Sequence, residues 1–320
     1  MRTAIPLTVL ATGLACSLFT APAQARARVF VASYGNDSNP CTFGSPCKTF
    51  QQAVNVVDVG GEVTAIDSAG FGPINITKSV TITSPPGVEA GIAAPAAGKS
   101  AITINTTSSN QIITLIGLTL DGANVSNTVG ISFIGLSGIL NVRDSVIRNF
   151  GSDGINFEAN ASSSSNSDPS QFYVSNTLIS DNGNIGIVIE PAGLGPTTGV
   201  LDHVQMENNA GEGLRVRADV QATQTVKVTV SDSVSANNAV DGVFALSVGG
   251  KATVMVRNSI LAYNQFGLET NGAGATIRVT RSTITGNQEA WFGTVLSYGD
   301  NNIDDNGNAN TEPPNPLTYK

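Results

Sequence analysis

The chain has 320 residues, a length that allows one large domain or two of ordinary size. It carries 16 Lys and Arg against 24 Asp and Glu, and this net charge of −8 argues against a nucleic-acid partner, because phosphate neutralisation needs several cations on one face. A single His and three Cys exclude most His- or Cys-based metal sites and any dense disulfide framework.

The first 25 residues have the pattern of a secretory signal peptide. One positive charge, Arg2, precedes an apolar run that ends in the small-x-small pattern of Ala23 and Ala25. This run is short for a membrane span, and no other stretch approaches roughly 20 uninterrupted apolar residues. We therefore expect cleavage near Ala25, a mature chain without a transmembrane segment, and a secreted protein in the extracellular space or the periplasm.

Two cysteines remain beyond the signal peptide. Cys41 and Cys47 lie in the segment CTFGSPC, and two nearby cysteines in a secreted chain most simply form one disulfide. The residues that follow predict a short amphipathic helix, because Phe50, Ala53 and Val54 fall on one helical stripe.

From residue 115 onward the sequence repeats. Each unit contains two short stretches of alternating apolar and polar residues, separated by Asn, Asp and Gly turns, and this alternation indicates strands. The third residue of each unit is in turn Gly117, Asp144, Asn176, His203, Asp232, Asn258 and Arg281, an average spacing of about 27 residues. Such units bury their apolar side only by stacking, which predicts a solenoid.

Three sets of positions recur at one phase of the repeat. The residues expected to point inward are Ile155, Phe157, Ile187, Ile189, Leu214, Val216, Val243 and Ala245. A glycine precedes each set, at Gly130, Gly154, Gly186, Gly213, Gly242 and Gly267, which predicts a corner that needs positive φ or a close approach between coils. An asparagine ladder is expected at Asn182, Asn209, Asn238, Asn264 and Asn287, with the amides hydrogen-bonded along the axis.

These repeats, of the form xx[DN]SxIxxN…GIxI, resemble the right-handed parallel β-helix of the pectin-lyase-like superfamily over about residues 61–305. The resemblance implies an all-β solenoid of about nine to ten coils, with an N-terminal capping helix within residues 41–60. The β-helix domain would span residues 26–306, and residues 307–320 would form a polar tail.

The resemblance leaves catalysis open. The polygalacturonase motifs N-T-D, D-D, G-H-G and R-I-K are absent in that arrangement, and so is the R-x-P-x-x-R signature of pectate lyases. His203 occupies a recurrent turn position, where an ordinary surface turn residue is expected. We therefore expect a secreted or cell-surface protein that binds a glycan or serves a structural role. The alternative is a polysaccharide lyase or glycoside hydrolase acting on an acidic polysaccharide.

In the enzymes that the chain resembles, the substrate groove follows the outward side of the strand after the recurrent glycine. The candidate substrate-binding residues on that side are Asn156, Glu158, Glu190 and Phe244. Glu212 and Asp241 are in phase on neighbouring coils, with Arg215 and Arg217 beside them.

Two interpretations of this group stay open. In the functional one, Glu212 and Asp241 are an acid/base pair or Ca²⁺ ligands, and Arg215 or Arg217 anchors a uronic acid. In the architectural one, acidic residues simply favour the turn before glycine, and the arginines are solvated partners of Glu190. No cofactor other than Ca²⁺ is suggested.

Overall fold

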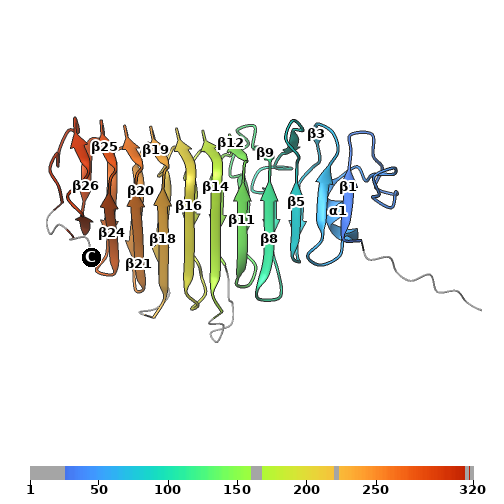
Figure 1. The fold of residues 1–320 in the computed structure, drawn as a ribbon, viewed down its shortest axis with the longest axis horizontal. Coiled ribbons are helices and arrows are strands. Elements are labelled where there is room, and N and C mark those ends of the chain that lie inside the picture. Colours follow the sequence, from blue (N-terminus) through green and yellow to red (C-terminus); the bar gives the residue numbers. More distant parts are fainter. Residues whose placement is uncertain (1–25, 160–167, 220–222, 314–316, 318–320) are drawn as a thin grey trace, which may run out of the picture.

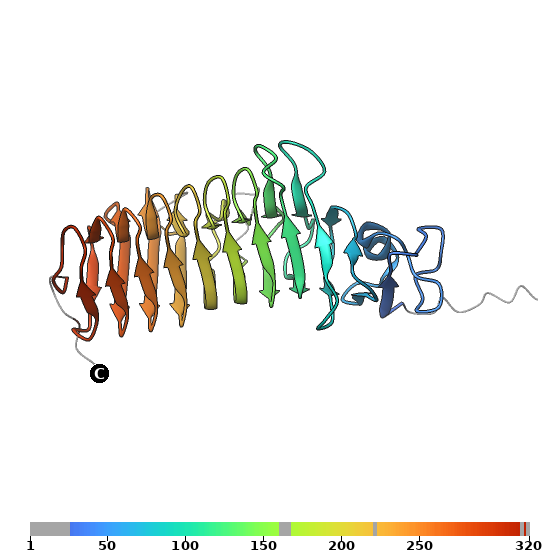
Figure 2. The same cartoon turned by 90° about the horizontal axis from the view of Figure 1, so that it is seen from above.

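The computed structural model describes residues 26–159, 168–219, 223–313 and 317. The chain winds into a long parallel β-solenoid, with successive coils stacked in chain order from the blue end to the red end (Figures 1 and 2). The predicted signal peptide, residues 1–25, lies outside the described residues. The helix within the described ranges is too short to cross a membrane.

One parallel sheet contains nine strands, one from each coil. In spatial order these are β4 (Ile74–Ile76), β7 (Ser100–Ile104), β10 (Val129–Phe133), β13 (Ile155–Phe157), β15 (Ile187–Ile189), β17 (Leu214–Ala218), β20 (Asp241–Ser247), β23 (Phe266–Asn271) and β26 (Glu289–Phe292). These nine strands come from nine successive coils, and the solenoid makes about eight full turns. The predicted all-β parallel β-helix is confirmed.

The other sheet has nineteen strands in two columns. Its long column contains β1 (Arg28–Val31), β2 (Glu62–Ala65), β5 (Val80–Thr83), β8 (Gln111–Ile116), β11 (Gly138–Arg143), β14 (Ser170–Ser180), β16 (Thr197–Glu207), β18 (Thr225–Ser231), β21 (Lys251–Arg257), β24 (Ala275–Thr280) and β27 (Val295–Ser297). Its short column contains β3 (Ala69–Gly70), β6 (Ala90–Ile92), β9 (Leu118–Asp121), β12 (Val146–Arg148), β19 (Val234–Ala236), β22 (Ile260–Ala262), β25 (Thr283–Thr285) and β28 (Asn302–Asp304). Strands β14 and β16 run through both columns and join them.

The bend between the two columns falls on the third residue of each repeat unit. These residues adopt positive φ, for example Asp144 at 51°, Asn176 at 47° and His203 at 55°. Short polar residues tolerate this left-handed conformation because their side chains hydrogen-bond locally. His203 is therefore a turn residue, with its Nδ1 3.2 Å from Asp202 Oδ1 and an exposed side chain.

The core is a set of stacked apolar columns between the sheets. All eight residues predicted to point inward have 0 % of their surface exposed. Aromatic rings continue the stacking, since the Phe157 ring centroid lies 4.7 Å from that of Phe133 and 5.3 Å from that of Phe172. Each such buried side chain contributes about 1.5–3 kcal/mol relative to an exposed one, so the stacking holds the coils together.

The recurrent glycines are needed for close approach between coils. A Cβ on Gly186 would lie 2.6 Å from the Gly213 carbonyl oxygen of the next coil, and one on Gly154 would lie 2.7 Å from the Gly186 oxygen. Their φ angles are ordinary, so of the two predicted reasons only the close approach applies.

The asparagine ladder is confirmed. Each side-chain amide donates to the Oδ1 of the next ladder residue, at 2.9 Å from Asn182 to Asn209 and 3.1 Å from Asn238 to Asn264. The ladder also continues past its predicted end, because Asn287 Nδ2 donates to Asn306 Oδ1 at 2.9 Å.

Both ends of the solenoid are covered. Helix α1 (Phe50–Val56) begins after Thr49, whose hydroxyl accepts from the Gln52 N–H, and it buries Phe50 against Phe71 with ring centroids 4.9 Å apart. The predicted disulfide Cys41–Cys47 is present, with the two Cα atoms 4.6 Å apart.

At the other end, the first residues of the predicted polar tail contact the last coil. Trp291 Nε1 donates to the Thr311 carbonyl at 2.9 Å, and the Asn301 N–H donates to Glu312 Oε1 at 3.1 Å. Thr311 and Glu312 of the predicted tail thus lie against the last coil.

Candidate functional site

The outer face of the nine-stranded sheet gathers the predicted site residues. The strand register aligns one outward residue from each of six coils, namely Asn156, Val188, Arg215, Phe244, Glu269 and Phe292. Neighbouring strands are about 4.8 Å apart, so these side chains form a continuous row. Phe244 is half-buried within it, whereas Val188 is only 4 % exposed.

Glu212 and Asp241 lie where their strands begin, on neighbouring coils: Glu212 is two residues before β17, and Asp241 is the first residue of β20. The Gly186 N–H donates to the Glu212 carbonyl at 2.9 Å, and the Gly213 N–H donates to the Asp241 carbonyl at 2.8 Å. This main-chain ladder fixes the two residues at the same phase, as their spacing predicts. Both side chains are buried, Glu212 to 4 % exposure and Asp241 to 1 %.

Asp241 has a second acidic neighbour, Glu269, on the following coil. Burial, together with the charges of Glu269 and Glu212, raises the pKa of Asp241 to about 8, and the charge of Arg215 opposes this only in part. Burial also raises the pKa of Glu269, although its hydrogen bond with Asp241 acts in the opposite direction. At neutral pH Asp241 is therefore protonated, and its carboxyl O–H donates a hydrogen bond to the Glu269 carboxylate.

Arg215 and Arg217 both form ion pairs with carboxylates of this chain. Arg215 Nη2 lies 2.5 Å from Glu212 Oε1. Arg217 binds two partners, with Nη1 2.8 Å from Glu190 Oε1 and Nη2 2.5 Å from Asp219 Oδ2. The architectural interpretation therefore describes Arg217 correctly, and it extends to Arg215 with a different partner.

Two further acidic residues belong to the same face. Asn156 Nδ2 on β13 donates to Oε1 of Glu158, which directly follows this strand, at 3.0 Å. Asp153 Oδ1 accepts from the Ile185 N–H at 3.1 Å and from Asn184 Nδ2 at 2.9 Å, so it ties its coil to the next one. Burial raises the pKa of Asp153 despite these hydrogen bonds.

Unpartnered polar atoms concentrate on this face. Among the described residues, six buried side-chain nitrogen or oxygen atoms have no hydrogen-bond partner, and four of them are here: Asn156 Oδ1, Arg217 Nε, Asp219 Oδ1 and Asp241 Oδ1. Buried polar atoms in folded proteins are nearly always hydrogen-bonded, so such a cluster marks a surface that can bind hydrogen-bonding groups from outside.

Ca²⁺ binding by Glu212 and Asp241 stays a prediction. Within the described part of the chain, no group of three or more His, Cys, Asp or Glu side chains is arranged to hold a metal. Ca²⁺ takes six to eight oxygens, and Glu212 is bound here to the Arg215 guanidinium.

Glu212, Asp241, Arg215 and Arg217 lie together as predicted, and Glu190 is a partner of Arg217, but the other pairings were not predicted. Glu269 is the partner of Asp241 and Asp219 is a partner of Arg217. The register offered one signal, because Glu269 follows Phe244 in the outward row. Asp219 lies beyond β17, where the repeat pattern carries no information.

Comparison with known proteins identifies the fold. No family model and no curated protein matches the chain. Among solved structures, the pectate lyase Pel9A superposes with a TM-score of 0.54 at 16 % identity, over 87 % of this chain and 70 % of that one. The A-module of the mannuronan C-5 epimerase AlgE4 of Azotobacter vinelandii gives a TM-score of 0.45 at 14 % identity, over 92 % and 89 % of the two chains. The chain therefore has the right-handed parallel β-helix fold of the pectin-lyase-like proteins.

Proposed function

We propose that this protein is secreted and binds a hydroxyl-rich polysaccharide along the outer face of the nine-stranded sheet. The cluster of four unpartnered buried polar atoms on that face carries the proposal. Secretion rests on the signal-peptide pattern of the first 25 residues.

The outward row of the nine-stranded sheet provides both the hydrogen-bonding groups and the apolar surface that a glycan chain contacts. Carboxylates accept hydrogen bonds from sugar hydroxyls, and Asn156 can both donate and accept. Phe244, half-buried between Arg215 and Glu269, presents an apolar surface to a sugar ring. A solenoid repeats these positions every coil, so consecutive sugar units meet consecutive strands.

The charges on the face favour a neutral glycan over an acidic one. Acidic side chains outnumber the two arginines on this face, even with Asp241 protonated. They are Asp153, Glu158, Glu190, Glu212, Asp219, Asp241 and Glu269. Because both guanidinium groups are already bound to carboxylates, neither is free to pair with a uronic acid. An acidic glycan would have to bring a cation such as Ca²⁺ to this face.

Affinity electrophoresis against neutral and acidic polysaccharides, with and without added Ca²⁺, tests the proposal. We expect retardation by a neutral polysaccharide that is lost in Phe244→Ala. Tyr173→Ala is the matched control, because Tyr173 is a half-buried aromatic residue in the outward register of β14, on the other sheet. Retardation that survives in Phe244→Ala and in a folded Glu212→Ala, Arg215→Ala, Arg217→Ala, Asp241→Ala variant would end the proposal.

A glycoside hydrolase is the second candidate, and the raised pKa of Asp241 favours it. A carboxyl group that stays protonated near neutral pH can act as a general acid toward a glycosidic oxygen. Release of new reducing ends by the wild type, abolished in Asp241→Asn, would establish this activity. Unsaturated products that absorb in the ultraviolet would indicate a lyase instead.

A further inference from the structure

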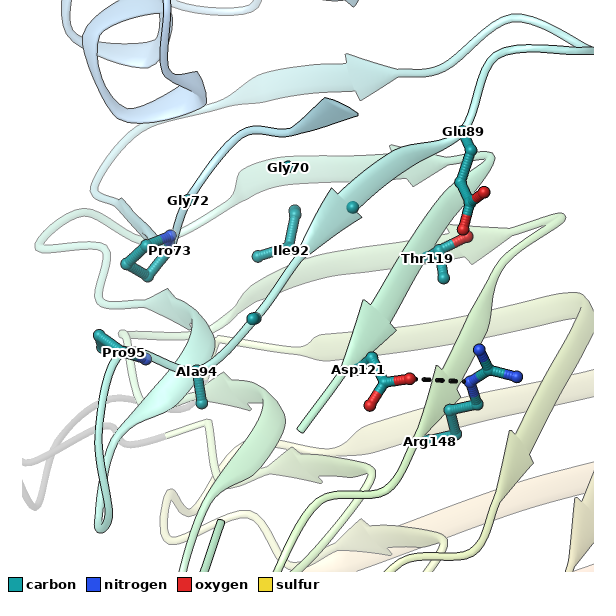
Figure 3. Close-up of a pocket in the computed structure, with 12 residues that line it drawn as sticks. Gly70, Gly72, Pro73, Glu89, Ile92, Ala94, Pro95, Thr119, Asp121 and Arg148 are labelled. Atoms are coloured by element: carbon teal, nitrogen blue, oxygen red, sulfur yellow. Dashed lines mark hydrogen bonds and ion pairs between the residues drawn. The ribbon is translucent and has the colours of Figure 1, made fainter. Parts of the chain in front are cut away.

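A pocket lies in the N-terminal half of the solenoid, on the short column rather than on the nine-stranded sheet. It spans the outer side of β3, β6, β9 and β12 and has a volume of about 470 Å³ (Figure 3). A second hollow of about 300 Å³ adjoins it and shares Gly70, Glu89 and Gly91 with it. The two together form a groove that extends over the four coils of β3, β6, β9 and β12.

Missing side chains create this groove. Gly70, Gly91 and Thr119 occupy the same register position on successive coils. A Cβ on Gly70 would meet no atom within 4 Å, and one on Gly91 would make only ordinary contacts at 3.5 Å and beyond. Two neighbouring coils thus expose bare backbone as a floor, and Val146 on β12 follows Thr119 in the same row.

The walls of the pocket differ in chemistry. Pro73, Pro95 and Ala94 stand on one side, and Glu89, Thr119, Asp121 and Arg148 stand on the other (Figure 3). The pocket therefore has an apolar wall facing a wall of hydrogen-bonding groups.

Hydrogen bonds fix the side chains of Asp121 and Arg148 in the wall of the pocket. Arg148 Nε donates to Asp121 Oδ2 at 3.0 Å, while the Ala123 N–H and Asn149 Nδ2 donate to Asp121 Oδ1 at 2.9 and 3.1 Å. Burial would raise the pKa of Asp121, but these hydrogen bonds outweigh it and lower the pKa, so the group is ionised. Within the described ranges, the terminal nitrogens of Arg148 and the side chains of Glu89 and Thr119 make no hydrogen bond.

We propose that this groove is a second saccharide site, which binds one or two neutral sugar rings independently of the nine-stranded sheet. A sugar ring has an apolar face of C–H groups and an edge of hydroxyls, which matches the two walls. Hydroxyls donate to the carboxylates of Asp121 and Glu89 and accept from the terminal nitrogens of Arg148. Two carboxylates against one guanidinium disfavour an anionic ligand, and the volume lies in the usual range of about 300–1,000 Å³ for small-molecule pockets.

Saturation-transfer NMR and calorimetric titration with cellobiose, maltose and lactose as probes test this site. The decisive variant is Gly70→Leu, which adds a side chain to the floor at a position where a Cβ meets no protein atom within 4 Å. The matched control is Gly44→Leu, because Gly44 also has open space around its Cβ but lies in the disulfide loop and lines neither pocket.

We expect at least one of these disaccharides to bind with a millimolar Kd, and we expect Gly70→Leu to weaken it at least tenfold, about 1.4 kcal/mol, while Gly44→Leu leaves it unchanged. Arg148→Met should weaken it as well. Phe244→Ala should have no effect, and that result separates this site from the proposed function of the nine-stranded sheet.

Wild-type affinity in Gly70→Leu would overturn the proposal. Binding of galacturonic acid oligomers in preference to every neutral probe would do so too, and so would the absence of binding by all three disaccharides well above about 1 mM. Equal melting temperatures of the wild type and both leucine variants confirm that a loss of binding does not reflect a loss of fold.

Discussion

The two halves of the solenoid use the same coil differently. From β13 onward the coils are regular, a buried asparagine occupies most of the ladder turns, and the outer face of the nine-stranded sheet carries paired charges. In the N-terminal half the loops project further, as the teal and green coils in Figure 2 show, and the ladder positions hold Ala123 and Phe150.

This difference shows that one fold makes two kinds of surface. Regular coils align the side chains at one repeat position into a row, in which arginines pair with carboxylates and one carboxyl group hydrogen-bonds to another. Irregular coils leave gaps between their loops, and at β3 and β6 the glycines turn such a gap into a pocket. The predictions below test how far each surface depends on the regularity of the stacking.

The largest effect is expected from a charge in the core. Ile187 is 0 % exposed and pairs in register with Ile155 and Leu214. In Ile187→Asp an unpaired carboxylate would sit between coils, at a cost of more than about 4 kcal/mol, and the solenoid should unfold. Circular dichroism during thermal melting measures this, with Ser132→Asp on the outer face as control. Cooperative melting of Ile187→Asp at the wild-type temperature would contradict its inward position.

Breaking the asparagine ladder should have the next largest effect. Asn238 accepts from the main chain and side chain of Asn209 and donates to Asn264 Oδ1 and to the Met206 carbonyl. Asn238→Ala leaves these buried groups unpaired, so we expect a loss of about 2–4 kcal/mol in the free energy of unfolding, measured by urea denaturation.

Asn141→Ala serves as the control for the ladder. Its side chain also bonds to the neighbouring coil, to Thr114 at 3.3 Å, but it is half-buried on the outer face. We expect less than about 0.5 kcal/mol there. Equal losses of unfolding free energy in the two variants would show that the buried ladder stabilises the regular half no more than an exposed hydrogen bond does.

A pair of glycine substitutions compares the two halves directly. In Gly186→Ala the new methyl group would meet the Gly213 carbonyl oxygen at 2.6 Å, so the coils must separate, and we expect a loss of about 1–3 kcal/mol. Gly70→Ala adds the same atom over the open groove and should stay within about 0.5 kcal/mol of the wild type. Denaturant unfolding of both variants decides this, and a reversed order would refute the assigned tight and open regions.

The smallest effect concerns pH. The folded chain keeps the Asp241 proton up to a pKa of about 8, whereas the unfolded chain loses it near the ordinary value of 3.8. The folded state therefore binds more protons between these values, and its stability declines as the pH rises through that window.

Asp241→Asn removes this decline and retains a hydrogen-bond donor for Glu269. We expect its Tm to exceed that of the wild type by roughly 2–5 °C above pH 8, and to approach the wild-type value near pH 4. Asp304→Asn, an exposed substitution in the last coil, controls for the loss of one formal charge. A difference in Tm that does not change with pH would rule out a proton held by Asp241.

Much of the architecture could be predicted because the sequence of a solenoid repeats with the period of its coils. A repeat of about 27 residues, with Ile187 and Leu214 at one phase and Asn182 and Asn209 at another, specifies which residues stack on which. The core columns, the ladder, the His203 turn and the Cys41–Cys47 disulfide all follow from spacing or from chain proximity.

The candidate sites depend on information that the period does not contain. The alignment of the units suggested Glu190 as partner of the arginines, which is correct for Arg217. It did not indicate Glu212 as partner of Arg215 or Asp219 as second partner of Arg217, because both lie on the same coil as their arginine. The proton shared by Asp241 and Glu269 requires their burial and the nearby charge of Glu212, which are properties of the packed structure.

The sequence by itself determined the fold, the inward faces and the order of the coils, because these depend on periodicity along the chain. Only the tertiary structure decided which charges pair, which carboxyl keeps its proton and where the groove opens. Gly70, Gly91 and Thr119 lie in separate irregular segments, and no spacing rule relates them. Their shared row exists because the coils are hydrogen-bonded in register, and the space above it is open because two of its three positions are glycines.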